Sequence, residues 1–471
     1  MKNHVKSKKH ILKLGLIAAA SAIWLIVRTG RKPSRITYPC QKAAIANIHV
    51  FLLILFAPLL DFRKRKTTLP HILNLRLIKT FLILSSLVLA FGCFRFTGNL
   101  SPVGDYYLPV PLNLKTQNAI NSAGSSNLFF IENASGIEGN MNVAFRGLLQ
   151  LMENHGLFFF KTTDQPAGLI GKDDVVLIKV NAVGPERAGT NTDLIKSLTE
   201  NILKHPEGFN GEIVVADNGQ NTGGLDLAES NAYDHSQSMQ DIVNTFASSK
   251  VSAWSWYTIR SNSINEYSQG DYDNGYVVNS TENPITHLHV SYPKFQTKYG
   301  TYISFKEGVW NTTTSAYDSG KLKIINVPIL KSHSDYGVTA CVKNYMGVAS
   351  QTLTNAHDKI KYGALGTEIA ETHFPTLTIL DAIWVNANPK ESGGACGPQT
   401  PYEVASFTNI IGASLDPVAL EYWAAKHILI PAAVQKGYTQ YSSLDPDYAP
   451  IVSGLTESYH NYLERSMNEL K

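Results

Sequence analysis

The chain has 471 residues, 44% of them hydrophobic and 10% aromatic, a composition typical of folded proteins and unlike that of disordered ones. Its formal charge of +3 is unevenly distributed: residues 1–95 contain seventeen Lys or Arg and one acid, Asp61, a balance of +16 that leaves −13 for the rest of the chain. An acidic folded part behind a basic, apolar leader argues against nucleic acid as the partner and points to a membrane.

Three apolar runs in this leader, residues 11–27, 43–60 and 77–94, each approach the roughly 20 residues that a helix needs to cross a bilayer. Basic clusters flank every run, which argues against the alternative that the runs are core helices of a soluble domain. We therefore expect residues 1–95 to be a multi-pass anchor of about three transmembrane helices, with the lipid bilayer as its partner. The basic stretch "VRTGRKPSR" after the first run favours an uncleaved anchor over a signal peptide.

The basic residues also predict an orientation. With the N-terminus inside, ten Lys or Arg of the leader fall on the cytoplasmic side and six on the other side. Because cytoplasmic loops carry the excess of positive charge, this orientation is favoured. It places the folded part, after residue 94, outside the cytoplasm.

The four cysteines suggest neither a disulfide framework nor a metal site. Cys40 and Cys93 belong to the leader, Cys341 and Cys396 to the folded part, and no C-x-x-C occurs. Zinc ribbons and cysteine-ligated iron–sulfur clusters are therefore not expected. Cys341 is near His333 in the sequence, but a buried free cysteine is favoured over a nucleophile.

The folded part is expected to hold one α/β domain over residues 171–430. Residues 96–170 are expected to be a linker and lead-in, since residues 96–125 are rich in Pro, Asn, Gly and Ser. Inside the domain, residues 225–320 are rich in Asn, Ser, Tyr and Thr and predict a long insertion of short strands and turns. Residues 431–471 are expected to be a C-terminal extension.

Apolar, β-branched segments predict a mostly parallel open sheet flanked by helices. The first helix, in a β–α–β unit, is expected to have Thr192 as its N-cap. A later helix is expected to begin at Asp416 and Pro417, an N-cap followed by a residue that suits the first turn. Residues 331–347 are expected to form a strand-exit loop and then a helix. The predicted strands lie in residues 173–185, 211–219, 321–330, 376–383 and 407–414.

Polar residues follow every predicted strand. Open α/β sheets bind ligands in the crevice beyond the carboxyl ends of their strands, so these residues predict a shared site. The alternative is that each strand simply exits into a polar loop, and that Asp416 only caps its helix. The residues concerned are Lys179, Asn181, Asp217, Asn218, Lys331, His333, Asp381 and Asp416.

Four blocks of this sequence, in order, resemble the domain-of-unknown-function 362 family. They are "VLIKVNAV…TNTD", "VPILKSHSDYGVTACVKNYMGV", "LTILDAI…GP" and "SLDPVALEYWAAK", which together cover roughly residues 170–430. The loop "RKPSRITYPCQ" (31–41) is similar to a membrane-anchored subgroup of that family. Some members carry a cysteine-rich ferredoxin-like segment, which this chain lacks. The resemblance implies a fold and a site more firmly than a reaction.

One hypothesis is an enzyme that acts on an anionic small molecule with the help of a divalent metal. His333 would be its acid–base group, since histidine titrates near neutrality, and Lys331 and Lys343 would be catalytic cations. The ligand would be bound by Lys179, Asn181, Asn218 and Asn344. A hard divalent cation would be held by the carboxylates of Asp217, Asp381 and Asp416.

Two further hypotheses use the same residues. A non-catalytic ligand-binding or envelope-assembly module would bind a partner in the same pocket without turnover. In a purely structural arrangement, the charged residues would pair as buried salt bridges, and removal of one partner would destabilise the fold.

Overall fold

The computed structural model describes residues 21, 105–110, 126–134, 138–220, 224–226, 229–230 and 234–471. The chain divides into two compact units, Met1–Asn99 and Leu100–Lys471, and the following description concerns the second. The predicted membrane anchor lies, except for Ser21, outside the described residues. Among the residues that are described, none of the helices is long and apolar enough to cross a bilayer.

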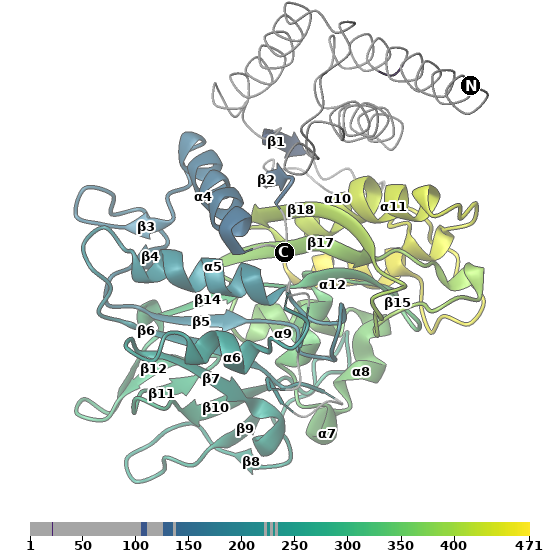
Figure 1. The fold of residues 1–471 in the computed structure, drawn as a ribbon. Helices are drawn as coiled ribbons and strands as arrows, with labels where there is room; N and C mark the ends of the chain where they lie inside the picture. Colours follow the sequence, from purple (N-terminus) through teal and green to yellow (C-terminus); the bar gives the residue numbers. More distant parts are fainter. Residues whose placement is uncertain are drawn as a thin grey trace, which may run out of the picture. The chain divides into compact units, whose positions relative to one another are not determined.

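A ten-stranded sheet forms the centre of the second unit, in the order β1-β2-β18-β17-β14-β5-β6-β7, with β15 and β16 attached beside β17 (Figure 1). Strands β7, β6, β5, β14 and β17 run parallel to one another, whereas β18 pairs antiparallel with β17, β2 with β18, and β1 with β2. The predicted α/β class with a largely parallel sheet is therefore confirmed. The strands are β1 (Asp105–Val110), β2 (Ser126–Glu132), β5 (Val175–Lys179), β6 (Glu212–Asp217), β7 (Val251–Ser255), β14 (Leu322–Asn326), β15 (Ile329–His333), β16 (Gly337–Thr339), β17 (Leu377–Asn386) and β18 (Ser406–Ser414).

Helices cover both faces of this sheet because alternate strand residues point to opposite sides. On one face, α4 (Glu138–Asn154), α5 (Thr192–Leu203) and α6 (Met239–Asn244) pack in one cluster with strand residues such as Ile178 and Ile379. On the other face, α9 (Ala364–Glu371), α10 (Pro417–Ala424) and α12 (Tyr459–Glu469) pack with residues such as Leu177 and Leu380. Shorter helical segments are α7 (Gln351–Thr354), α8 (Ala356–Lys359), α11 (Ile430–Gln435), the π-helical turn Ala425–Leu429 and the 3₁₀ turns η2 (Trp256–Ile259) and η4 (Lys343–Gly347).

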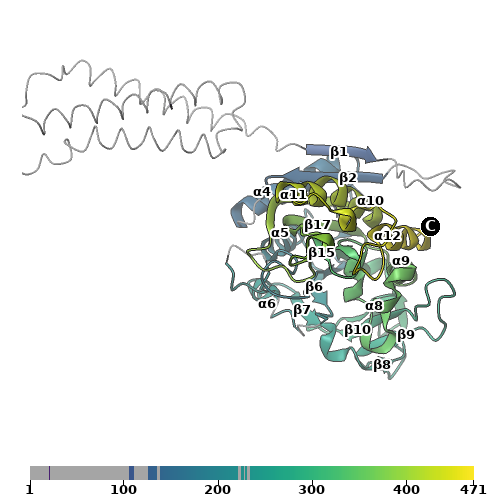
Figure 2. The same cartoon turned by 90° about the vertical axis from the view of Figure 1, so that its right-hand side faces the viewer.

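The predicted insertion is only partly separate from the sheet. Within residues 225–320, α6 and β7 belong to the main α/β layers. The remainder forms a six-stranded sheet of short strands, antiparallel except for the parallel pair of β8 and β9. Tyr292, Phe295 and Ile303 of this second sheet belong to the same core cluster as the main sheet. Figures 1 and 2 place it at the end of the unit away from β1 and β2. Its strands are β8 (Ser263–Ile264), β9 (Gly275–Val278), β10 (Ser291–Gln296), β11 (Tyr302–Ser304), β12 (Gly308–Asn311) and β13 (Ala316–Asp318).

Local structure differs from expectation at two helix starts and agrees at a third. The N-cap of α5 is Asn191, whose side chain accepts the Asp193 and Leu194 backbone N–H groups, and Thr192 is the first helical residue. The segment after β16 is the 3₁₀ turn η4, not the predicted α-helix. Asp416 caps α10 as predicted, accepting the Ala419 N–H.

The segments on either side of the predicted domain pack into its core. Strand β2 pairs with β18, and α4 buries Phe145 against the sheet. Another pair of strands, β3 (Phe160–Lys161) and β4 (Ile170–Gly171), also precedes the predicted start at residue 171. At the other end, Tyr462 of α12 is fully buried in the core.

We predict that Phe145→Ala in the full chain lowers the free energy of unfolding by about 3–5 kcal/mol, because it leaves a cavity beneath α4. Val143→Ala on the same helix is the matched control, since Val143 is 54% exposed. Chemical denaturation monitors both variants. Equal, small losses in both would mean that α4 is not part of the cooperative core.

Candidate functional site

The site lies where the order of the parallel strands reverses. From β5 the chain continues to β6 and β7 on one side, whereas β14 returns to the other side of β5. Lys179 and Asn326, the last residues of β5 and β14, are direct neighbours in the register of these two strands. Such a switch point leaves a crevice beyond the carboxyl ends of the strands, which is where α/β sheets bind ligands.

A buried ion pair fixes this point. Lys179 is fully buried, and its ammonium lies 2.6 Å from Asp217 Oδ2 and donates to the carbonyls of Val180 (2.7 Å) and Asn344 (2.9 Å). Burial lowers the pKa of Lys179, and the Asp217 charge opposes that shift. The ammonium has three donors, and all three are used. Lys179, predicted to bind ligand, is therefore engaged within the protein.

Gly347 allows the chain to pass directly over this pair. A methyl group at Gly347 would overlap both Asp217 Oδ2 and Lys179 Nζ, so only glycine fits. The Asn218 backbone N–H donates to the Gly347 carbonyl at 3.1 Å. The ion pair therefore determines the path of η4, which carries Lys343 and Asn344.

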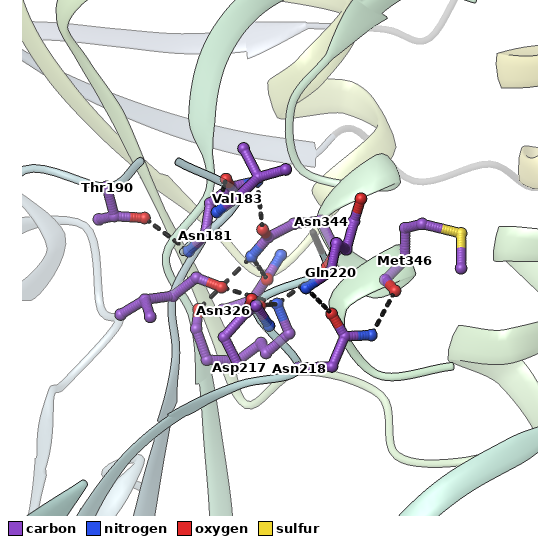
Figure 3. Close-up of polar contacts among 12 residues, drawn as sticks. Asn181, Val183, Thr190, Asp217, Asn218, Gln220, Asn326, Asn344 and Met346 are labelled. Atoms are coloured by element: carbon purple, nitrogen blue, oxygen red, sulfur yellow. Dashed lines mark hydrogen bonds and ion pairs between the residues drawn. The ribbon is translucent and has the colours of Figure 1, made fainter. Parts of the chain in front are cut away.

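Side-chain amides connect η4 to the strand ends (Figure 3). Asn344 Nδ2 donates to Asn326 Oδ1 (2.8 Å), and Asn344 Oδ1 accepts from Asn181 Nδ2 (3.3 Å). Asn218 Nδ2 donates to the carbonyls of Met346 (2.9 Å) and Ala349 (3.0 Å). The structure thus brings together Asn181, Asn218 and Asn344, as predicted, and adds Asn326. These side-chain amides form their hydrogen bonds mainly with other groups of the protein, and they act as a frame that holds η4 against the strand ends.

A cavity of about 510 Å³ opens beside this frame. Besides apolar groups such as Met346, it is lined by polar side chains from the main sheet, α8 and the insertion. His333 is the predicted site residue of β15 that reaches it. The polar lining includes Asn218, Arg260, His333, Asp335 and His357.

Lys331 and Lys343 are both buried near this cavity without a carboxylate partner. Lys331 donates to the Ala188 carbonyl, and no salt bridge joins either lysine to a carboxylate of the described residues. Burial lowers the pKa of Lys331 well below its usual value, and the charge of Lys343 lowers it further. Burial lowers the pKa of Lys343 to about 8, although the charges of Asp335 and Glu421 oppose that shift.

His333 is held as a neutral ring. Burial lowers its pKa well below the usual value, and the charge of Lys343 is the next cause. Its Nδ1 accepts a hydrogen bond from the backbone N–H of Asp335, with 3.1 Å between the two nitrogens. In the neutral ring the remaining proton is then on Nε2, so His333 is a hydrogen-bond donor at that atom.

The three aspartates predicted to share a cation are kept apart by other roles. Asp217 pairs with Lys179, and Asp381 accepts the backbone N–H groups of Asn191 (2.7 Å) and Ile383 (3.1 Å). Burial raises the pKa of Asp381 to about 6. Among the described residues, these three do not form a group close enough to bind one metal ion.

Asp416 lies at the opposite edge of the sheet, which corrects the expectation that it joins the site. Because β18 runs antiparallel to β17, its last residue, Ser414, pairs with Thr378 at the beginning of β17. Asp416 follows Ser414, caps α10 and accepts a hydrogen bond from Ser126 Oγ (2.5 Å). Asp416 therefore follows the alternative interpretation of the sequence, in which it only caps its helix.

Another group has atoms near enough to share an ion. One potential ligand atom from each of His333, Asp335 and His357 lies within 4.8 Å of the others. Two observations argue against a bound cation. The hydrogen bond at His333 Nδ1 leaves the ring proton on Nε2, the nitrogen that would bind a metal. The charge of Lys343 also lowers the pKa of both histidine rings. The positive charge of Lys343 therefore opposes a cation at this place. Asp335 was missed although it lies only two residues after His333, and His357 was missed because it follows no predicted strand.

The C-terminal helix supports the site from behind. Glu421 Oε2 accepts the Val342 N–H (2.7 Å), and the Tyr462 hydroxyl of α12 lies 3.1 Å from Glu421 Oε1. Burial raises the pKa of Glu421 to about 7. The backbone N–H of Thr456 donates to the Asp335 carbonyl at 2.8 Å. The last part of the chain thus contacts Glu421 and Asp335, and Asp335 lines the cavity.

Comparison with known proteins gives a family and no activity. A family model described as "Domain of unknown function (DUF362)" matches residues 176–426, which is more than half of the chain. The matched part contains every site residue named above except Tyr462 and Thr456. Neither a curated protein nor a solved structure matches the chain.

We predict that Lys179→Met lowers the free energy of unfolding by about 3–5 kcal/mol, because Asp217 is left buried without its partner. The double variant Lys179→Met/Asp217→Asn should lose less, since it removes both charges. Lys204→Met is the control, as the Lys204–Glu200 pair is at the surface, with Lys204 71% exposed, and contributes about 1 kcal/mol or less. Denaturant titration measures all three. Loss of ligand binding with unchanged stability would restore Lys179 to a binding role.

Proposed function

The chain belongs to the DUF362 family, and we propose that it is an enzyme that binds an anionic small molecule in the cavity at the carboxyl edge of its sheet. The observation that carries this proposal is the pair of buried lysines, Lys331 and Lys343, that lack a carboxylate partner. Two like charges held close together in a buried position destabilise each other. An anion in the cavity would offset both charges, and it would then be bound tightly.

The proposal assigns distinct roles to the residues around the anion. Lys331 supplies a positive charge when the anion is bound, because the anion's charge opposes the lowering of the Lys331 pKa by burial. Arg260 of the insertion adds a second positive group at the cavity wall. His333 donates from Nε2 to an oxygen of the substrate; it replaces the acid–base role expected from the sequence, because a ring held neutral is a poor base at neutral pH. Lys343, with its pKa near 8, is the group able to accept a proton.

The proposed function does not use a metal ion. The three aspartates expected to hold one are committed to other contacts, and the histidines of the cavity face lysines. A cation at this place would meet the same repulsion that an anion relieves. The substrate itself is therefore expected to supply the negative charge.

A binding module would use the same cavity without turnover. The two functions separate when small molecules that copurify with the protein are identified by mass spectrometry and incubated with it again. Conversion of the bound compound supports the enzyme. Its unchanged recovery over many hours, together with tight binding, would support the module.

We predict that sulfate and phosphate raise the melting temperature of the wild type relative to chloride of equal ionic strength. At a hundredfold excess over Kd, the gain is about 2.7 kcal/mol. Lys331→Met should abolish that gain and leave the melting temperature without anion unchanged or higher, because an uncompensated buried charge is removed. Lys298→Met, at an exposed site, is the control and should keep the gain. A Lys331→Met variant that still responds fully to both oxyanions would contradict the proposed site.

We also propose that residues 1–95 anchor the protein in a membrane, with the folded unit outside the cytoplasm. Three apolar runs flanked by basic clusters support this proposal. The protein should then remain in membranes washed with alkaline carbonate, and protease added to intact cells should digest the folded unit. Release by carbonate would contradict the anchor. Digestion only after lysis would contradict the orientation.

A further inference from the structure

Four lysines are buried in the described part of the chain, and three of them have hydrogen-bond acceptors. Lys179 has three acceptors, including the Asp217 carboxylate. Lys294 lies 3.4 Å from Asp271 Oδ1 and also faces the Tyr267 ring. Lys331 donates to the Ala188 carbonyl. These contacts are what a buried ammonium group requires.

Lys343, the fourth, has no hydrogen-bond acceptor or ion pair among the described residues, although only 4% of it is exposed. Its Nζ lies 5.7 Å from the centre of the Tyr336 ring. An ammonium group without acceptors is costly to bury, whereas a neutral amine has no charge to desolvate. The pKa of about 8 agrees with this environment, because it leaves a free-amine fraction near neutral pH.

The surroundings place this amine beside the cavity. The Tyr336 ring packs against the rings of His333 (5.9 Å between centres) and His357 (5.3 Å), and both histidines line the cavity. The charge of Lys343 lowers the pKa of both rings, which also reflects its nearness to them. Removing a lysine from solvent by burial is one of the ways in which proteins make an amine nucleophilic.

We propose that Lys343 forms an imine with a small aldehyde or ketone that carries a carboxylate or another oxyanion. The inference rests on the proposed function, since Lys331 and the cavity bind the anionic part while Lys343 meets the carbonyl carbon. The Nζ lone pair forms the C–N bond, and the carbonyl oxygen becomes a hydroxyl with the proton that Nζ loses. The C–O bond then breaks, and the hydroxyl leaves as water with a second proton. One carbonyl compound and one amine give one imine and one water, with no oxidant or reductant.

Reductive labelling of the full-length protein tests this reaction. The protein is treated at neutral pH with glyoxylate and cyanoborohydride, which traps an imine as a stable secondary amine, and the modified lysine is located by peptide mass spectrometry. We expect Lys343 to be modified at least about tenfold faster than the exposed Lys298 in the same sample, because its lower pKa gives it more free amine. Formaldehyde in place of glyoxylate should also modify Lys343, but with a smaller preference over Lys298, because formaldehyde has no carboxylate.

Two variants sharpen the test. Lys343→Arg keeps the charge and should give no adduct at this position. Lys331→Met should reduce modification of Lys343 by glyoxylate and leave that by formaldehyde unchanged. The proposal is overturned if Lys343 of the wild type is modified no faster than Lys298 by either reagent. If sulfate and phosphate still stabilise such a protein, only the imine chemistry fails. Modification of Lys343 without oxyanion binding would support the amine and contradict the proposed anion site.

Discussion

The site depends on the ion pair between Lys179 and Asp217 at the ends of two adjacent parallel strands. With no solvent around it, the pair is stable only because every remaining donor of Lys179 finds a backbone carbonyl. One of those carbonyls belongs to Asn344, and Gly347 passes directly over the pair. The same contacts that satisfy the buried charges therefore determine where η4 lies. Lys343, which η4 carries, is consequently positioned by an interaction in which it takes no part.

Around this fixed point, the charges divide into two kinds. Lys179 and Asp217 form an ion pair, whereas Lys331 and Lys343 have no ion pair among the described residues. The charges of Asp335 and Glu421 only partly oppose the lowering of the Lys343 pKa by burial. The charge of Lys343 in turn lowers the pKa of His333 and His357, which favours the neutral form of both rings. The frame of asparagine amides adds rigidity without adding charge. In the proposed complex, the position of each lysine decides which part of the substrate it meets.

The sequence predicts most of the sheet because buried parallel strands have a distinctive pattern. Aliphatic residues predominate in "VVLIK" and "LKIIN", as expected of buried strands, and both are strands of the main sheet. It also predicts the edge at which Lys331 and His333 lie. The direction of β18 could not be predicted, because antiparallel and parallel neighbours leave no distinct mark in so short a segment. The placement of Asp416 failed for that reason.

The partners of the site residues were harder to predict than the residues themselves. The sequence around Lys179 does not show whether this lysine pairs with Asp217, 38 positions away, or binds a ligand. Asp335 lies two residues after the end of β15, but nothing local separates it from the other polar residues of that loop. His357 lies in a short helix without any motif. Asn326 could have been found, because it is the polar end of a strand, as Lys179 is. Contacts between residues far apart in the sequence decide whether a polar side chain is bonded within the protein or can bind a ligand. These contacts are known only once the fold is known.

The contribution of α12 has a consequence for how the protein matures. Tyr462 and the backbone of Thr456 support Glu421 and Asp335, yet they come from the final part of the chain. During synthesis these residues leave the ribosome after the strands that carry Lys179 and Lys331. A nascent chain can therefore pair its central strands before Glu421 and Asp335 receive these hydrogen bonds. The sheet is then formed earlier than the contacts that hold the loop and the helix next to it.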